Sequence, residues 1–292
     1  MRRRDFITLL GGATAARPLA ARAQQGERMR RVAVLMSTAA DDPEGQARVM
    51  AFVQGLQQWG WFVGDNLRID TRWTAGDPER TRRDVAELVA LAPDVIFANS
   101  TAAVGPLLQV NRTIPVVFAV VSDSVGAGYV DSLARPGGNA TGFMVFEYSI
   151  SGKWVELLKQ IAPSVRRAAV FRDPTTPTGM GQFGVIQSVA PSHSVELYPV
   201  NVRDPAEIGR AVEAFARSPH GGLIVTPSAL AVVHRDLIVA LAVRHQLPAV
   251  YPVRVFVASG GLISSTKTDE RPVTSIASSR ARNRLTYRCR RR

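Results

Sequence analysis

The feature that most constrains this chain is the regular alternation of short apolar runs with longer amphipathic segments from residue 31 onward. This rhythm is typical of βαβ units, in which helices join parallel strands, and it argues against a β-sandwich. It predicts strands at 32–36, 67–73, 94–98 and 116–120, with helices at 45–59, 78–91 and 101–110. Asp77 is the expected N-cap residue of the helix at 78–91, and Pro78 occupies its first position.

A second series of the same kind follows the Gly137-Gly138-Asn139 turn. The expected strands are 168–171, 195–200, 223–225 and 248–251, and the expected helices are 151–161, 178–189, 205–216 and 229–244. Because helices cover both faces of a parallel sheet, two such series predict two sheets with a cleft between them. The predicted fold class is therefore α/β, with two doubly wound parallel-sheet lobes.

Polar residues recur where the predicted strands end. Small ligands of open parallel sheets bind in the crevice outside the carboxyl ends of the strands, where hydroxyls and helix N-terminal amides can contact them. Ser, Thr and Asp at these places are also ordinary helix N-caps, and for any single residue both interpretations stay open. The polar strand ends are Ser37-Thr38, Asn99-Ser100-Thr101, Ser122-Asp123-Ser124, Arg172-Asp173-Pro174 and Thr226-Pro227-Ser228.

The net charge of +12 is concentrated at the two ends of the chain. Residues 1–23 hold five Arg and one Asp, and residues 265–292 hold nine Lys or Arg and two acids, which leaves about +1 for everything between them. A body so close to neutral offers no extended basic surface for a phosphate backbone. We therefore expect no nucleic-acid partner.

The first 23 residues have the three parts of an export signal in order: a basic start, a short apolar stretch, and the ending Ala21-Arg22-Ala23. The arginines at positions 2–4 followed by Asp-Phe-Ile resemble a twin-arginine leader. No other run approaches the roughly 18 apolar residues of a membrane span. We expect an exported, periplasmic protein with no integral membrane segment after processing. Its only cysteine, Cys289, leaves it without an internal disulfide.

The motifs of common catalytic sites are absent from the sequence. There is no phosphate-binding loop and no nucleophile elbow, and the four histidines lack metal-ligand spacing. Residues 179–184 match G-x-G-x-x-G, but residues 173–178, two of them prolines, intervene after the preceding strand, so we interpret the match as the start of a helix. The sequence predicts a protein that is not an enzyme and that uses no cofactor or metal.

Three segments resemble the extracytoplasmic substrate-binding proteins of ABC importers, in the branch related to aromatic amino-acid and tryptophan-type binders. They are GLQQWGWFVGDNLRIDTRWTAGDPER, LAPDVIFANSTAAVGPL and, most specifically, SDSVGAGYVDSLARPGGNATGF. The resemblance covers about residues 31–264. It implies a type I periplasmic-binding-protein fold whose lobes are 24–147, together with 254–264, and 148–253. It also implies closure of the lobes on a small organic molecule, an amino acid or similar, which a monomer delivers to a membrane permease.

The resemblance places the ligand-binding positions of the family at the strand ends already derived. Tyr251 adds either an aromatic wall of the pocket or a filler of the hinge. Two other functions remain as alternatives: a ligand-sensing module of a signalling receptor, and an α/β enzyme. The predicted ligand-binding residues are Ser37, Thr38, Ser100, Thr101, Asp123, Ser124, Asp173, Thr226, Ser228 and Tyr251.

The chain departs from the family pattern after residue 264. The resemblance implies a further turn, a helix of the first lobe and a crossing strand, but residues 265–292 are rich in Ser, Thr and Arg without apolar periodicity. Such a composition predicts a disordered basic tail and C-terminal elements that are missing from the fold. We interpret the change as a frameshift or truncation, with a natural basic tail or a membrane-surface patch as alternatives.

Overall fold

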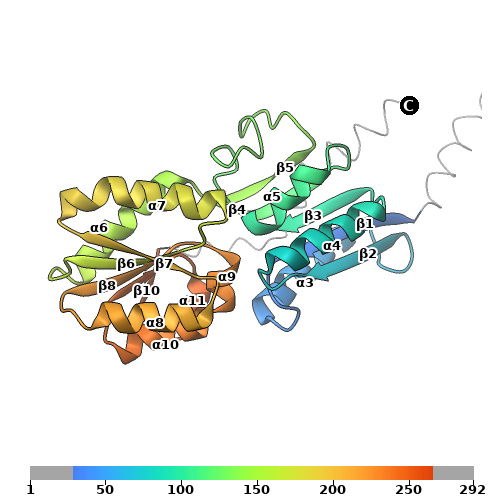
Figure 1. Ribbon diagram of the computed structural model, residues 1–292. Coiled ribbons are helices and arrows are strands. Elements are labelled where there is room, and N and C mark those ends of the chain that lie inside the picture. Colours follow the sequence, from blue (N-terminus) through green and yellow to red (C-terminus); the bar gives the residue numbers. More distant parts are fainter. Residues whose placement is uncertain (1–28, 266–292) are drawn as a thin grey trace, which may run out of the picture.

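The computed structural model describes residues 29–265, whose strands fall into two separate parallel sheets (Figure 1). The export signal predicted at 1–23 and nearly all of the tail predicted at 265–292 lie outside these residues. The first lobe comprises β1 (Arg30–Met36), α3 (Pro43–Gln57), β2 (Leu67–Trp73), α4 (Pro78–Ala90), β3 (Val95–Asn99), α5 (Thr101–Val110), β4 (Val116–Ser122) and β5 (Ala140–Phe146).

The second lobe repeats this plan. Its elements are η1 (Tyr148–Ser151), α6 (Gly152–Ile161), β6 (Arg167–Arg172), α7 (Pro177–Val189), η2 (Ala190–His193), β7 (Glu196–Asn201), α8 (Pro205–Ala216), β8 (Gly221–Val225), α9 (Ala229–Val233), α10 (Arg235–Arg244), β9 (Ala249–Tyr251), α11 (Arg254–Ala258) and β10 (Ile263–Ser264). Within the described residues the chain passes from one lobe to the other once, between β5 and η1.

The two sheets have the same doubly wound topology. The strand orders are β2-β1-β3-β4-β5 and β10-β9-β8-β6-β7, and every pairing is parallel. In each lobe the first strand lies between the second and the third, so the strand order reverses between β1 and β3 and between β6 and β8. Ligands of such sheets bind at this reversal. The fold class predicted from the sequence is confirmed.

Each sheet carries helices on both faces, as burial of parallel strands requires. In the first lobe α3 packs on one face, and α4 and α5 pack on the other. In the second lobe α6 and α7 pack on one face, and α8 to α11 pack on the other. The layers explain why the central strands are near-continuous apolar runs; β8, for example, is buried at every position.

The segment 254–264 belongs to the second lobe, which corrects the prediction that it returns to the first. β10 pairs with β9, and Phe256 of α11 is fully buried in the second-lobe core. The physical reason is aromatic packing, because the Phe256 ring stacks on Tyr251 with centroids 5.2 Å apart.

Two further elements differ from the predicted ones. β5 was not predicted, because the glycines before and within it read as a turn, yet it pairs along β4. The helix predicted at 229–244 is broken at His234, where the backbone leaves the helical region (φ −94°, ψ 16°). The break places Arg235 at the start of a new helix.

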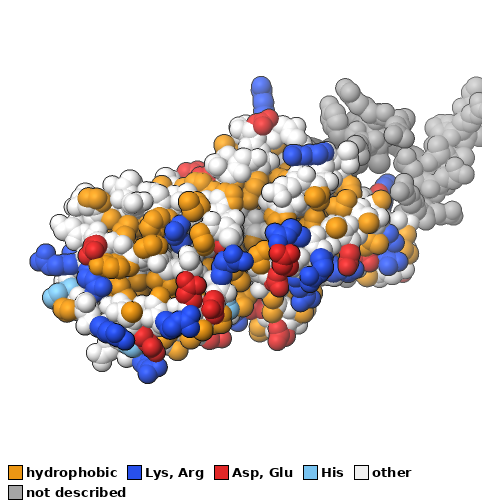
Figure 2. Space-filling model, in the orientation of Figure 1, with side chains coloured by type: hydrophobic (Ala, Val, Ile, Leu, Met, Phe, Trp, Pro, Cys, Tyr) orange, Lys and Arg blue, Asp and Glu red, His pale blue; other side chains and the backbone are white. Residues whose placement is uncertain are grey.

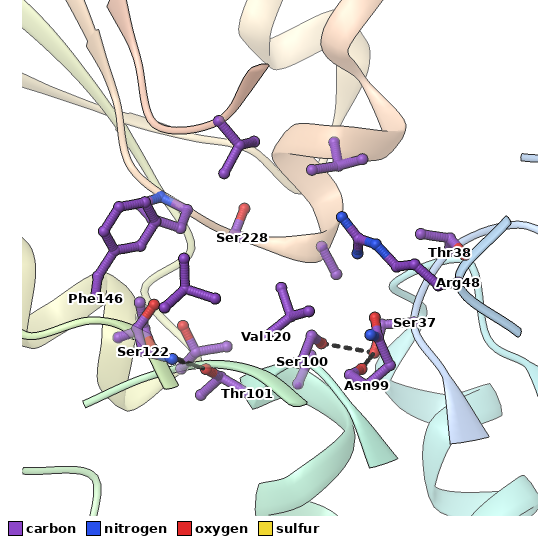
Figure 3. A pocket seen from close by; sticks show the side chains of 18 residues that line it. Ser37, Thr38, Arg48, Asn99, Ser100, Thr101, Val120, Ser122, Phe146 and Ser228 are labelled. Atoms are coloured by element: carbon purple, nitrogen blue, oxygen red, sulfur yellow. Dashed lines mark hydrogen bonds between the residues drawn. The ribbon is translucent and has the colours of Figure 1, made fainter. Parts of the chain in front are cut away.

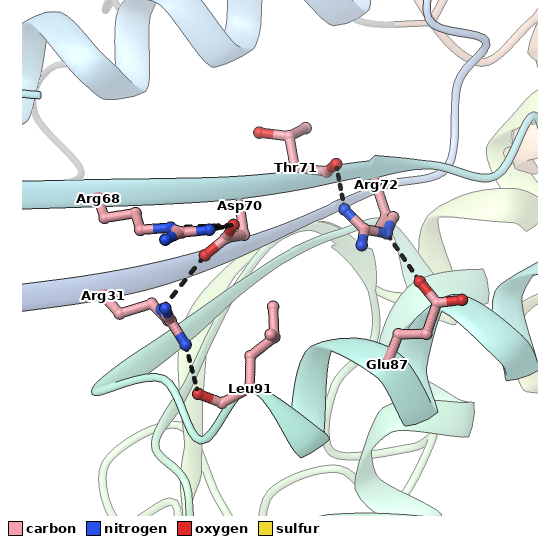
Figure 4. A network of polar contacts seen from close by, with 7 residues as sticks. All are labelled: Arg31, Arg68, Asp70, Thr71, Arg72, Glu87 and Leu91. Carbon is pink, nitrogen blue, oxygen red and sulfur yellow. Dashed lines mark hydrogen bonds and ion pairs between the residues drawn. The ribbon is translucent and has the colours of Figure 1, made fainter. Parts of the chain in front are cut away.

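Charged groups on the first lobe largely pair with one another. Asp70 on β2 pairs with Arg31 at 3.4 Å and Arg68 at 3.3 Å, and Arg72 pairs with Glu87 of α4 at 3.1 Å (Figure 4). On the face in Figure 2, basic and acidic side chains are interspersed over the described residues. This surface agrees with the near-neutral body inferred from the sequence.

The N-cap of α4 gives the first testable prediction. Asp77 Oδ1 accepts hydrogen bonds from the backbone N–H groups of Glu79 and Arg80, at 2.8 and 3.1 Å. The bond from Arg80 is the main cause that lowers the pKa of the Asp77 carboxyl below its ordinary value. Asp77→Ala is therefore expected to lower the free energy of unfolding by about 1 kcal/mol at pH 7.

The sign of the pH dependence follows from the lowered pKa. A carboxyl that is more acidic when folded stabilises the protein above its unfolded pKa of about 3.9, and this contribution is lost as the pH falls through the folded pKa. Urea denaturation of both proteins from pH 7 to pH 3 should show the difference shrinking on the acid side. A difference that stays constant over this range would contradict the assignment.

Candidate functional site

The carboxyl ends of strands from the two lobes face each other across a cavity (Figure 3). The first lobe contributes residues after β1 and β3, the last residues of β4 and β5, and one residue of α3. The second lobe contributes residues after β6, β8 and β9. Both strand-order reversals therefore open into the same space. The cavity is lined by Ser37, Thr38, Arg48, Asn99, Ser100, Thr101, Ala102, Val120, Ser122, Val145 and Phe146 of the first lobe, and by Thr176, Thr178, Pro227, Ser228, Ala229, Val232 and Val253 of the second.

A short chain of hydrogen bonds fixes the first-lobe wall. Ser37 Oγ donates to the Asn99 carbonyl at 2.9 Å, and Ser100 Oγ donates to Ser37 Oγ at 2.7 Å. Ser100 adopts φ 86° and ψ 159°, a backbone conformation that residues other than glycine rarely adopt. Strained residues of this kind cluster at functional sites.

The lobes are in contact across the cleft. Thr178 Oγ1 of α7 donates to Thr101 Oγ1 of α5 at 3.1 Å. Arg235 Nη1 of α10 pairs with Asp42 Oδ2, the N-cap residue of α3, at 2.8 Å. The structure thus has a closed arrangement, and its interlobe contacts include one neutral pair and one charged pair.

The structure brings half of the predicted ligand-binding residues to the cavity. Ser37, Thr38, Ser100, Thr101 and Ser228 line it. Ser228 is also the N-cap residue of α9, because its Oγ accepts the backbone N–H of Ala231 at 2.9 Å. Direct contact of these five residues with a ligand remains a prediction.

The other predicted residues do not line the cavity, because the protein uses their polar groups internally. Asp123 accepts the backbone N–H groups of Gly126 and Tyr148, at 2.7 and 3.2 Å. Asp173 Oδ1 accepts the N–H and the hydroxyl of Thr175, at 3.0 and 2.7 Å. Except for the bond from Tyr148, which joins η1 to the loop after β4, these bonds are those of ordinary loop turns, the alternative that the sequence left open.

The same holds for Ser124, Thr226 and Tyr251. Ser124 is 1% exposed, and its carbonyl accepts the backbone N–H of Tyr129 at 2.9 Å. Thr226 Oγ1 donates to the Phe171 carbonyl at 2.8 Å. Tyr251 lies in the second-lobe core, where burial raises the pKa of its hydroxyl to about 12. Tyr251 is therefore not an aromatic wall of this cavity.

Several lining residues escaped the sequence analysis. Thr176 is the N-cap residue of α7 and Thr178 lies in its first turn, where a Cβ on Gly179 would collide with the carbonyl oxygen of Asp173. This close approach explains a glycine in the G-x-G-x-x-G match and presents Thr178 to the cleft. Arg48 lies inside the amphipathic helix α3, where the sequence carries no signal that separates it from a surface arginine.

Comparison with known proteins decides the family. Residues 32–273 match the family model of the ABC transporter substrate binding proteins. The chain belongs to this family. None of the helices within residues 29–265 combines the length and the apolar character that crossing a membrane requires.

Individual relatives of this family member support the same fold. A tyrosine-binding protein of Clostridioides difficile (strain R20291) is 25% identical over 211 residues, which are 72% of this chain and 60% of that protein. The chain thus spans about 60% of the length of this curated relative.

Solved structures agree with the fold of this family member. A conserved domain protein of Vibrio cholerae has a TM-score of 0.77 at 23% identity, covering 91% of this chain and 86% of that one. An ABC domain in complex with L-Trp, from Streptococcus pneumonia, has a TM-score of 0.76 at 20% identity, covering 89% and 85%. The resemblance inferred from the sequence is confirmed, and the two-lobe architecture is that of periplasmic binding proteins.

Proposed function

We propose that this family member binds a small organic molecule, an amino acid or a similar compound, in the cleft and delivers it to an ABC importer in the membrane. The single observation that carries the proposal is the cavity lined by strand ends of both lobes. A ligand held there contacts both lobes at once and favours their closed arrangement. Two relatives, the tyrosine-binding protein and the ABC domain in complex with L-Trp, agree with a small organic molecule.

The second part of the proposed function is delivery of the ligand to the permease. In this mechanism the closed, ligand-bound protein docks on a permease as a monomer, outside the cytoplasm, and releases the ligand there without chemical change. Support comes from the family and from the export signal predicted at residues 1–23. The protein contributes no catalytic group to the process.

Calorimetric titration of the purified protein with amino acids, aromatic acids and other small carboxylates tests the binding step. We expect saturable binding of at least one compound in the micromolar range, about −8 kcal/mol, and recovery of the compound unchanged. Thr178→Val, which removes an interlobe hydroxyl from the cavity wall, should weaken that binding. Absence of binding throughout the library, or conversion of a compound, would contradict the proposal.

A further inference from the structure

The cavity contains one charged side chain, Arg48 of α3. The other lining residues of the described chain carry hydroxyls, one carboxamide or apolar groups. The side chain is 25% exposed, and its guanidinium extends from α3 toward the second lobe (Figure 3). Glu44 Oε1 holds Nε at 3.2 Å and Nη2 at 3.1 Å, and Nη1 takes no part in these contacts. Glu44 thus holds Arg48 in position, and the N–H groups of Nη1 can still donate to a ligand.

Two other features of the same wall suit an anion. The ten-residue helix α5 begins at Thr101, and its cap residue Ser100 makes no side-chain capping bond. Ser100, Thr101 and Ala102 line the cavity, so the positive end of the helix dipole lies at its wall. Separately, Thr38 is 5% exposed and lines the cavity, and its Oγ1 has no hydrogen-bond partner within residues 29–265. This hydroxyl lies against Gly45 of α3, so Thr38 closes the cavity wall beside Arg48 without adding negative charge to it.

Four carboxylates near the cleft have ion-pair or hydrogen-bond partners within the protein. Asp42 pairs with Arg235 and caps α3, and Glu44 pairs with Arg48. Asp123 and Asp173 accept hydrogen bonds from their own loops, as described above. None of these four carboxylates lines the cavity.

The charge distribution distinguishes a carboxylate without an ammonium group from an amino acid. From it we infer that the ligand is a small monocarboxylate with an apolar body and no ammonium group. Its carboxylate lies between Arg48 and the first turn of α5, and its body contacts Val120, Phe146 and Val232. An amino acid would instead place its ammonium in the closed cavity without a carboxylate to pair with, which is unfavourable. This inference rests on the proposed function and narrows its ligand class.

Matched sets of compounds test the inference by calorimetry on the intact protein. One set is 3-phenylpropionate, L-phenylalanine and 2-phenylethylamine; the others are the corresponding sets of tyrosine and tryptophan. Within any set that binds, the carboxylate should bind at least about tenfold more tightly than the amino acid, since the cost of an unpaired buried charge exceeds the gain from added hydrogen bonds. The amine should show no binding.

Variants of Arg48 test whether this side chain causes the preference for carboxylates over amino acids. Arg48→Gln should weaken carboxylate binding by about 30-fold, the effect of one charged hydrogen-bonding partner, and Arg48→Lys should restore part of the loss. Arg80→Gln is the matched control, because Arg80 forms a similar i,i+4 pair with Asp84 on α4 outside the cavity. It should leave the affinity unchanged.

The outcomes separate the inference from the proposed function. An amino acid that binds as tightly as its carboxylate, or more tightly, overturns the inference and supports the proposed function. Equal loss in the Arg48 and Arg80 variants, or no binding by any member of the three sets, also overturns the inference. The wider compound library then decides the proposed function independently.

Discussion

Arg235→Ala is expected to favour open lobes and to weaken ligand binding by about 30-fold, equivalent to about 2 kcal/mol. Arg235 Nη1 and Asp42 Oδ2 are 2.8 Å apart, and the two side chains are 19% and 6% exposed. Breaking a fully buried pair costs about 3–5 kcal/mol and an exposed pair about 0–1 kcal/mol, so this partly buried pair falls between them. Loss of this pair acts on closure, because the two residues belong to different lobes; Arg235 Nη1 also donates to the Val232 carbonyl of its own lobe at 2.9 Å.

The measurements are the affinity for the tightest ligand of the library and the radius of gyration by small-angle X-ray scattering. Asp42→Asn should act like Arg235→Ala, because the amide oxygen can still cap α3 while the charge is lost. Arg244→Ala is the control on the same helix, since its pair with Glu213 spans 3.9 Å between exposed side chains. If Arg235→Ala left the affinity unchanged, the ion pair between Arg235 and Asp42 would not contribute to closure, which contradicts the prediction.

Trp154→Ala is expected to give the largest loss of stability, about 4 kcal/mol in the free energy of unfolding. Trp154 of α6 is 1% exposed and contacts Phe146 edge-on, with ring centroids 6.1 Å apart. Phe146 ends β5 and lines the cavity, so this pair joins the second-lobe core to the site where the chain crosses between lobes. The variant should therefore also weaken ligand binding.

Trp154→Phe is the matched control. The indole Nε1 is buried and has no hydrogen-bond partner within residues 29–265, so phenylalanine removes an unpaired donor while keeping an aromatic ring. We expect a loss below about 1.5 kcal/mol. Guanidinium denaturation of the three proteins provides the comparison. Equal stability of the alanine and phenylalanine variants would show that ring packing does not hold this region.

The sequence predicted the architecture because parallel sheets leave a strong pattern. Each βα pair combines a buried apolar run with an amphipathic helix, and several predicted elements, such as Leu67–Trp73 and Thr101–Val110, agree with the structure at both ends. β5 was not predicted, because an edge strand that contains glycine has the composition of a turn. The placement of 254–264 failed because it depended on an expected hinge rather than on the packing of Phe256.

The candidate site was predictable only in part, for a physical reason. The position of a residue after a strand indicates the right edge of the sheet, which located Ser37, Thr38 and Ser100. It does not indicate whether a carboxylate turns toward the ligand or toward its own loop, as Asp123 and Asp173 do. A side chain such as Arg48 reaches the cavity from the middle of a helix, and only the packing of α3 against the sheet determines that.

Hydrogen exchange with and without a bound compound tests the central claim, that one ligand occupies the cleft and contacts both lobes. Amides of residues 37–38, 100–102, 176 and 178 are expected to become protected together when the compound is added, because these residues line one cavity from opposite lobes. Protection confined to one lobe, or located away from these strand ends, would contradict the account.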